Sequence, residues 1–143
     1  MTDPQSTLHA LVPVPLPASP AQRLLLFAMR RMGGNGLHDA ACAQAFLMAF
    51  GRDFRRPLTV MRAFMAETAR TSRHSITISP PCCRRMTTDE ATLVEAVRRA
   101  ATAPAMSALL IADLLGRREG DGITPIATLL ATAFADSGFP LGD

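Results

Sequence analysis

Two adjacent cysteines followed by two arginines, Cys82, Cys83, Arg84 and Arg85, are the side chains best suited to chemistry. They directly precede a helix start predicted at 87–90, where Thr-Thr-Asp-Glu forms a capping box. Guanidinium groups and the positive end of a helix favour thiolates and attract anions. Adjacent Cα atoms lie ~3.8 Å apart, closer than disulfides prefer, so a bond between these sulfurs would be strained and easily reduced. The segment therefore predicts a redox-sensitive or anion-binding site, although a structural role for one cysteine is the competing interpretation.

A zinc site is the second hypothesis. His38 and Cys42 are four residues apart, so both can lie on one face of a helix. Cys82, Cys83 and Cys42 complete four ligands with either His38 or His74 if the chain between the helices folds back, and zinc is the cofactor this set would hold. Consecutive cysteines point apart in an extended chain, however, and Cys42 lies in an apolar stripe, where packing in the core competes with metal binding.

The third hypothesis is a nucleic-acid or nucleotide binder that uses the basic region Arg55–Arg85. All 15 basic residues are arginine, and residues 1–85 hold eleven of them against four acids, a net charge of +7. Residues 86–143 carry a net charge of −4. Basic surfaces bind phosphates, but solvated helix faces with salt bridges explain the same pattern, and few side chains are suited to reading bases. The candidate residues are Arg52, Arg55, Arg56, Arg62, Arg70 and Arg73.

Several classes of protein are disfavoured. The sequence contains no phosphate-binding loop, dinucleotide fingerprint, zinc-protease motif or serine-hydrolase elbow, which argues against an enzyme without deciding the matter. It contains no apolar run of the ~18 residues that a membrane span needs. The first residues lack the basic start of a secretory signal, so we expect a cytoplasmic protein with reduced cysteines.

Apolar spacing predicts six helices in one all-α domain. Ser19, Thr87 and Thr124 are the expected N-caps, and glycines at 33–34 and 51 are the expected stops for the first two helices. We expect the fifth helix, apolar almost all round, to be the central one, and the third helix to lose burial toward its end. Residues 74–81 read as an extended connector without a partner strand. The helices are expected at about 20–32, 39–50, 57–70, 87–101, 104–115 and 125–136.

These elements favour a compact bundle of about six short helices. Residues 1–19 form a flexible Pro-rich tail in this prediction, residues 20–138 a single helical domain, and residues 139–143 a C-terminal tail. The leading hypothesis for function is a small non-catalytic interaction or regulatory protein whose partner is another protein. Nucleic acid is the less favoured partner, no membrane is involved, and the oligomeric state is left open.

Four stretches resemble a family of short uncharacterised alphaproteobacterial proteins. They are Gly-Leu-His-Asp-Ala at 36–40, Phe-Arg-Arg-Pro-Leu at 54–58, Arg-Ala-Phe-Met-Ala-Glu at 62–67, and Cys-Cys-Arg-Arg-Met-Thr-Thr-Asp-Glu at 82–90. The resemblance covers roughly Pro20 to Phe134, and the last stretch is the most distinctive. It implies a bacterial source and no particular activity.

Overall fold

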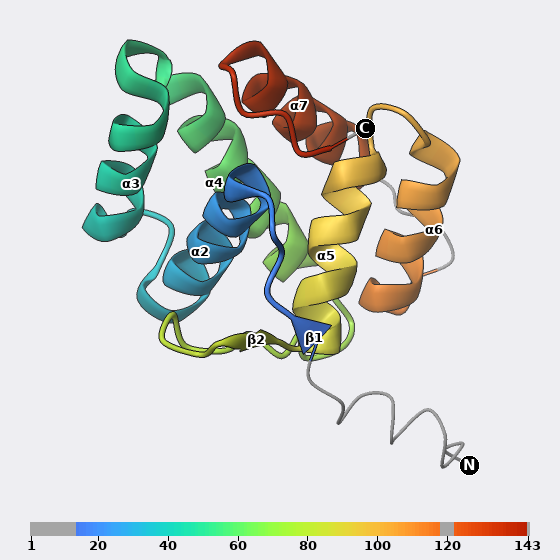
Figure 1. Cartoon of the computed structure of the whole chain (residues 1–143). Coiled ribbons are helices and arrows are strands. Elements are labelled where there is room, and N and C mark those ends of the chain that lie inside the picture. Colours follow the sequence, from blue (N-terminus) through green and yellow to red (C-terminus); the bar gives the residue numbers. More distant parts are fainter. Residues whose placement is uncertain (1–13, 118–121, 143) are drawn as a thin grey trace.

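Six α-helices form most of the chain that the computed structural model describes, namely residues 14–117 and 122–142. A 3-10 turn and two strands of two residues each complete the elements (Figure 1). The expected all-α bundle of about six helices is therefore confirmed. The elements are β1 Val14–Pro15, α2 Pro20–Asn35, α3 Ala40–Phe50, η1 Gly51–Asp53, α4 Arg55–Thr71, β2 Arg85–Met86, α5 Thr88–Arg99, α6 Pro104–Leu115 and α7 Ile123–Asp136.

Polar side chains cap the starts of three helices. The Ser19 hydroxyl accepts a backbone N–H from the first turn of α2, as predicted. The Asp39 carboxylate accepts the Cys42 N–H at 2.9 Å at the start of α3. Thr87 and Glu90 form the predicted capping box of α5. Each cap satisfies an N–H that the helix itself cannot pair.

The end of α2 differs from the prediction. Gly33 and Gly34 are helical, and the helix ends at Gly36, where φ is 100°. Gly33 faces the connector, because a β-carbon there would lie 3.4 Å from a methyl group of Ile78. Helix α3 ends at Gly51, with φ of 62°, as predicted. Glycine serves two purposes here, since it permits close packing at one position and a positive φ at others.

Helix α4 is longer and more buried than predicted. It begins at Arg55, so Pro57 is the third residue of the helix instead of the first. Thr68 and Thr71, near its end, are both buried. Their hydroxyls donate to carbonyls one turn earlier in the same helix, both at 2.7 Å. The expected loss of burial is wrong because these hydroxyls are satisfied within the helix and their methyl groups can pack.

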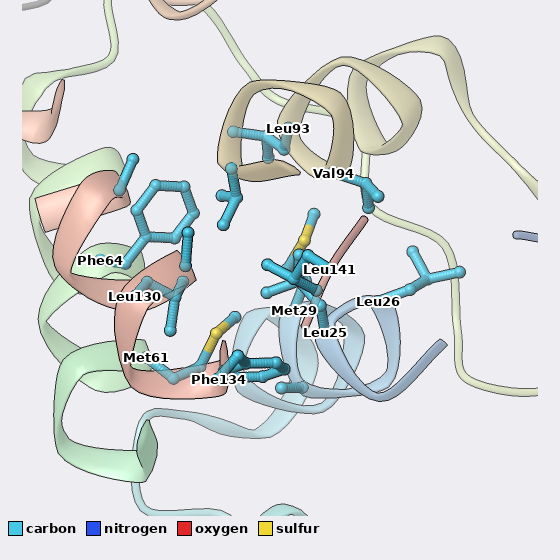
Figure 2. Packing of buried hydrophobic residues seen from close by; sticks show 14 of the residues in the cluster. Leu25, Leu26, Met29, Met61, Phe64, Leu93, Val94, Leu130, Phe134 and Leu141 are labelled. Atoms are coloured by element: carbon cyan, nitrogen blue, oxygen red, sulfur yellow. The ribbon is translucent and has the colours of Figure 1, made fainter. Parts of the chain in front are cut away.

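The core lies where α2, α4, α5 and α7 meet (Figure 2). Helix α4 packs most extensively on α7, and α5 on α6. Four phenylalanines join α3 and the C-terminal segment to this core, with ring centroids 5.1 to 5.9 Å apart in edge-to-face geometry. They are Phe46, Phe50, Phe134 and Phe139.

Helix α6 lies on one side of the molecule, and the prediction that it is the central helix is wrong. It packs against α5 and α7, while α3 lies on the opposite side (Figure 1). Met106 and Leu109 of α6 are 44% and 66% exposed. Leu129, which the apolar stripe of α7 places in the core, is 54% exposed. Helix α7 begins at Ile123 without a side-chain cap, so Thr124 is not its N-cap.

Both segments predicted as tails contribute described residues that pack against the helices. Val14 and Pro15 of β1 pair antiparallel with Met86 and Arg85 of β2. At the other end, Leu141 is only 3% exposed. Described residues on both sides of 20–138 therefore pack against the helices, while the domain boundaries stay a prediction. In the described part of the chain, no helix has both the length and the apolar character needed to cross a membrane.

Candidate functional site

Residues 72–84, between α4 and β2, have no regular helix or strand, as predicted for 74–81, and we call this whole segment the connector from here on. Ile76 and Ile78 are half-buried and pack against the core. Between them, the Thr77 N–H donates to the Asp89 carboxylate at 2.8 Å. The connector is therefore fastened to the core by apolar contacts and to the start of α5 by a hydrogen bond.

The candidate site is the tight turn at the end of this connector. The Cys83 N–H donates to the Pro80 carbonyl at 3.1 Å, which closes the turn. Pro81 follows Pro80, and its fixed φ suits the first central position of a turn. We call residues 80–85 the Cys–Arg turn, because it carries Cys82, Cys83 and two arginines.

Arg30 of α2 holds the Cys–Arg turn from inside. Its Nη1 donates to the Cys83 carbonyl and its Nη2 to the Arg85 carbonyl, both at 2.7 Å. Its Nε and Nη2 also donate to the Glu90 carboxylate, at 2.8 and 3.1 Å. Arg30 is 3% exposed and Glu90 is fully buried. One guanidinium therefore joins α2, the turn and α5.

The Glu90 carboxylate accepts hydrogen bonds from Arg30 and from the backbone. Besides Arg30, the carboxylate accepts the N–H groups of Thr87 at 2.8 Å and Ser79 at 3.2 Å. Burial alone raises the pKa of Glu90, but the hydrogen bonds from Arg30 and from these two amides outweigh it, so the pKa lies below its usual value. The carboxylate is therefore charged at neutral pH.

The start of α5 is occupied by the chain's own acids. Asp89 and Glu90 lie in its first turn, and both accept backbone N–H groups. This arrangement leaves little attraction for an external anion at the helix start, which the sequence had suggested as an extra anion site. The side chains of Arg84 and Arg85 are exposed, and neither forms an ion pair with a described residue. Any anion at the turn must be held by these two side chains.

The three cysteines occupy different environments, and none forms a disulfide. Cys82 is exposed and Cys83 is half-buried, so both thiols belong to the surface of the turn. Cys42 is buried in the core, and burial, assisted by the Asp39 carboxylate, raises its pKa to about 11. Cys42 is therefore protonated and unreactive at neutral pH.

The predicted zinc ligands do not assemble. No group of three or more His, Cys, Asp or Glu side chains in residues 14–117 and 122–142 is arranged to hold a metal ion. His38 is exposed and precedes α3, whereas Cys42 points into the core. His74 packs over Gly116, where an added β-carbon would overlap its imidazole ring. His38 and Cys42 do not share one face of a helix, because α3 begins after His38.

The predicted basic region is divided among separate places. Arg52, Arg55 and Arg56 are exposed around the start of α4, where they line a hollow of about 380 Å³ with two aspartates. Arg56 forms an ion pair of 3.0 Å with Asp136, one of these two. The hollow therefore combines both signs of charge.

The other arginines of this set have different partners. Arg62 donates to the Leu37 carbonyl at 2.9 Å, and Arg70 pairs with Glu67. Arg73 is exposed just beyond the end of α4. Since α4 has 17 residues, its two ends are about 25 Å apart. The structure does not bring the predicted arginines into one basic surface.

Arg30 is the residue of the candidate site that sequence reasoning missed. The only signal was its position in α2, directly after the apolar residues Ala28 and Met29, where an arginine needs a buried partner. The capping box identified Glu90, but nothing in the local pattern of either helix connects two residues separated by 60 positions.

A family model described as "Family of unknown function (DUF6628)" matches residues 4–133. The chain belongs to this family. The match includes the Cys–Arg turn, Arg30 and Glu90, and it confirms the expected resemblance to an uncharacterised family. The bacterial source and the family-wide Cys-Cys segment stay predictions. No curated protein and no solved structure matches the chain.

Proposed function

We propose that this DUF6628 protein is a non-catalytic interaction protein that docks an acidic segment of a partner on the Cys–Arg turn. We further propose that oxidation of Cys82 and Cys83 weakens the docking. The observation that carries the proposal is the pair of hydrogen bonds from Arg30 to the Cys83 and Arg85 carbonyls. They hold the backbone of the turn in place before a partner arrives, which reduces the ordering cost of binding.

The charge of the turn suits a carboxylate-rich partner. Arg84 and Arg85 are exposed and without an ion pair among the described residues, so both guanidiniums are open to a ligand. A guanidinium binds a carboxylate through two parallel hydrogen bonds, which gives direction as well as attraction. Beside the turn, Arg30, Pro80 and Pro81 help to line a hollow of about 310 Å³ that can receive a partner side chain.

Oxidation has a balanced route through a small-molecule disulfide such as glutathione disulfide. The Cys82 thiolate attacks one sulfur of the oxidant, forming a mixed disulfide and releasing one thiol. The Cys83 thiolate then attacks Cys82 and displaces the second thiol. The two cysteines lose two electrons and two protons, and the oxidant is reduced to two thiols.

The resulting bond conflicts with the geometry of the turn. Adjacent cysteines are closer than a disulfide prefers, so the peptide between them must distort. That peptide supplies the Cys83 N–H that donates to Pro80, and it directly precedes the Cys83 carbonyl that accepts from Arg30. We therefore expect oxidation to weaken the hydrogen bonds that hold the turn.

The docking test uses a fluorescein-labelled peptide of alternating glutamate and serine, measured by fluorescence anisotropy. The double variant Arg84→Ser/Arg85→Ser should weaken binding by about tenfold or more. The matched control is Arg52→Ser/Arg55→Ser, which removes the same charge from an exposed place elsewhere and should change affinity much less. Equal losses in both variants would show that only net charge matters. Tighter binding of a generic oligonucleotide than of the peptide would favour a nucleic-acid partner.

The redox test compares the reduced protein with protein oxidised by glutathione disulfide. Oxidised wild type should have a mass lower by two hydrogens and should bind the peptide more weakly. Cys82→Ser/Cys83→Ser should bind equally before and after the same treatment. Formation of glutathione adducts alone, or unchanged affinity of the oxidised wild type, would refute the redox part while leaving the docking part intact.

A further inference from the structure

We propose that a second, separate site binds a small amphipathic carboxylate, of the class of a medium-chain fatty acid, between α4 and the connector. A cavity of about 290 Å³ lies there. It is distinct from the Cys–Arg turn, so the failure of the docking proposal would not affect it. Its volume is at the lower end of the range for ligand pockets, which restricts the occupant to a small molecule.

Most of the cavity wall is apolar. Met65 and Ala69 of α4 form one side, Ile76 and Ile78 of the connector the other, and Leu93 of α5 contributes from the core. Met65, Ile76 and Ile78 are half-buried instead of fully packed. Among the residues that the structure describes, no Asp, Glu or Arg side chain lines the cavity. An alkyl chain in this space would remove apolar surface from water on both sides.

The polar groups of the cavity gather near one end of α4. The Thr68 hydroxyl donates to the Phe64 carbonyl at 2.7 Å, and the Ser72 hydroxyl donates to the His74 carbonyl at 2.5 Å. Both hydroxyl protons are therefore already used. The imidazole of His74 forms no hydrogen bond with any described residue, which leaves it as the group able to donate to a ligand.

His74 also has a defined position. Its ring packs over Gly116, at which φ is +70° and a β-carbon would overlap the imidazole. His74 is exposed as well as lining the cavity, so it lies at the opening. Arg73, the next residue back along the chain, is exposed and has no ion pair with a described residue. A carboxylate head at the opening therefore meets the His74 imidazole, with the positive charge of Arg73 one residue away in the chain, while its tail meets apolar walls.

The test is isothermal titration calorimetry of the full chain with decanoate below its micelle concentration. Ala69→Leu places a larger side chain in the cavity and should weaken binding by about tenfold or more. The control is Ala66→Leu, an equally large change at an exposed position of the same helix outside the cavity lining, which should leave affinity unchanged. His74→Gln/Arg73→Gln should weaken decanoate but not uncharged decanol. Absence of saturable heat, or equal effects of both leucine variants, would overturn the proposal.

Methyl NMR provides a second measurement that needs no variant. Decanoate should shift the methyl signals of Ile76 and Ile78, and it should leave those of Ile126 in α7, outside the cavity lining, unchanged. Uniform small shifts of all three would indicate nonspecific association and would overturn the proposal even if heat were observed.

Discussion

Replacing Arg30 with methionine should destabilise the protein more than any surface substitution. The change keeps a long apolar stem but removes the guanidinium that donates four hydrogen bonds. It leaves the Glu90 carboxylate, which is fully buried, without its countercharge. The Cys83 and Arg85 carbonyls lose a donor as well, but they lie on a partly exposed turn that water can reach. The buried carboxylate is therefore the dominant cost.

Removing one partner of a buried ion pair costs about 3–5 kcal/mol. That is a large share of the roughly 5–15 kcal/mol by which whole domains are stable. For a chain of this length, it corresponds to a decrease in Tm of about 10–15 °C. The control is Arg56→Met, which breaks an ion pair whose side chains are both more than half exposed and should cost less than about 1 kcal/mol. The double variant Arg30→Met/Glu90→Met should recover much of the loss, because it removes the unpaired charge.

Urea unfolding followed by circular dichroism at several pH values measures these effects. The folded-state pKa of Glu90 is lowered, so its ion pair contributes fully above the usual value of 4.5 and loses its contribution as pH falls through the folded-state pKa. Without Arg30, burial should raise the pKa of Glu90. Protonation of Glu90 at low pH should then remove much of the destabilisation of the variant. Wild type and Arg30→Met should therefore converge in stability as pH falls from 7 to 4. A difference that is small at pH 7, or that stays constant with pH, would refute the reasoning.

Two further predictions concern the glycines and the buried thiol. Gly116→Ala should lower the free energy of unfolding in urea by more than about 1–2 kcal/mol, because the φ of +70° at this position disfavours a side chain and the new β-carbon would overlap His74. Gly34→Ala, at a helical position with nothing within 4 Å, should instead stabilise by about 0.4–1 kcal/mol, and the opposite order would contradict the described backbone. In a thiol titration at pH 8, Cys82 should react in the native protein, while Cys42, with a pKa of about 11, should react only after unfolding. Rapid labelling of Cys42 in native protein would show that its burial is wrong.

The starts of α2 and α5 followed from local chemistry and were predictable. Ser19 and the Thr87–Glu90 capping box mark helix starts because their side chains pair with N–H groups a few residues away. Such interactions depend only on neighbouring residues, so the sequence pattern carries them directly. The cysteine doublet also lies shortly before the start of α5, as predicted.

Burial was less predictable where a helix is apolar on several faces. Helix α6 has almost no polar residue to show which side faces water, and only its position beside α5 and α7 leaves Met106 and Leu109 exposed. The same applies to Leu129 of α7. The spacing of apolar residues indicates which residues share a helix face, but it does not indicate how many neighbouring helices cover that face.

The sequence by itself determined the helical class, the capped starts of α2 and α5 and the position of the cysteine doublet shortly before α5, since all of these depend on short-range patterns. Tertiary structure alone decided which helices form the core, that the zinc ligands stay apart, and that Arg30 reaches Glu90 across 60 residues. The physical reason is that a buried charge requires a partner wherever the fold can supply one. That partner is set by the packing of α2 against α5 and the connector, which no local pattern specifies.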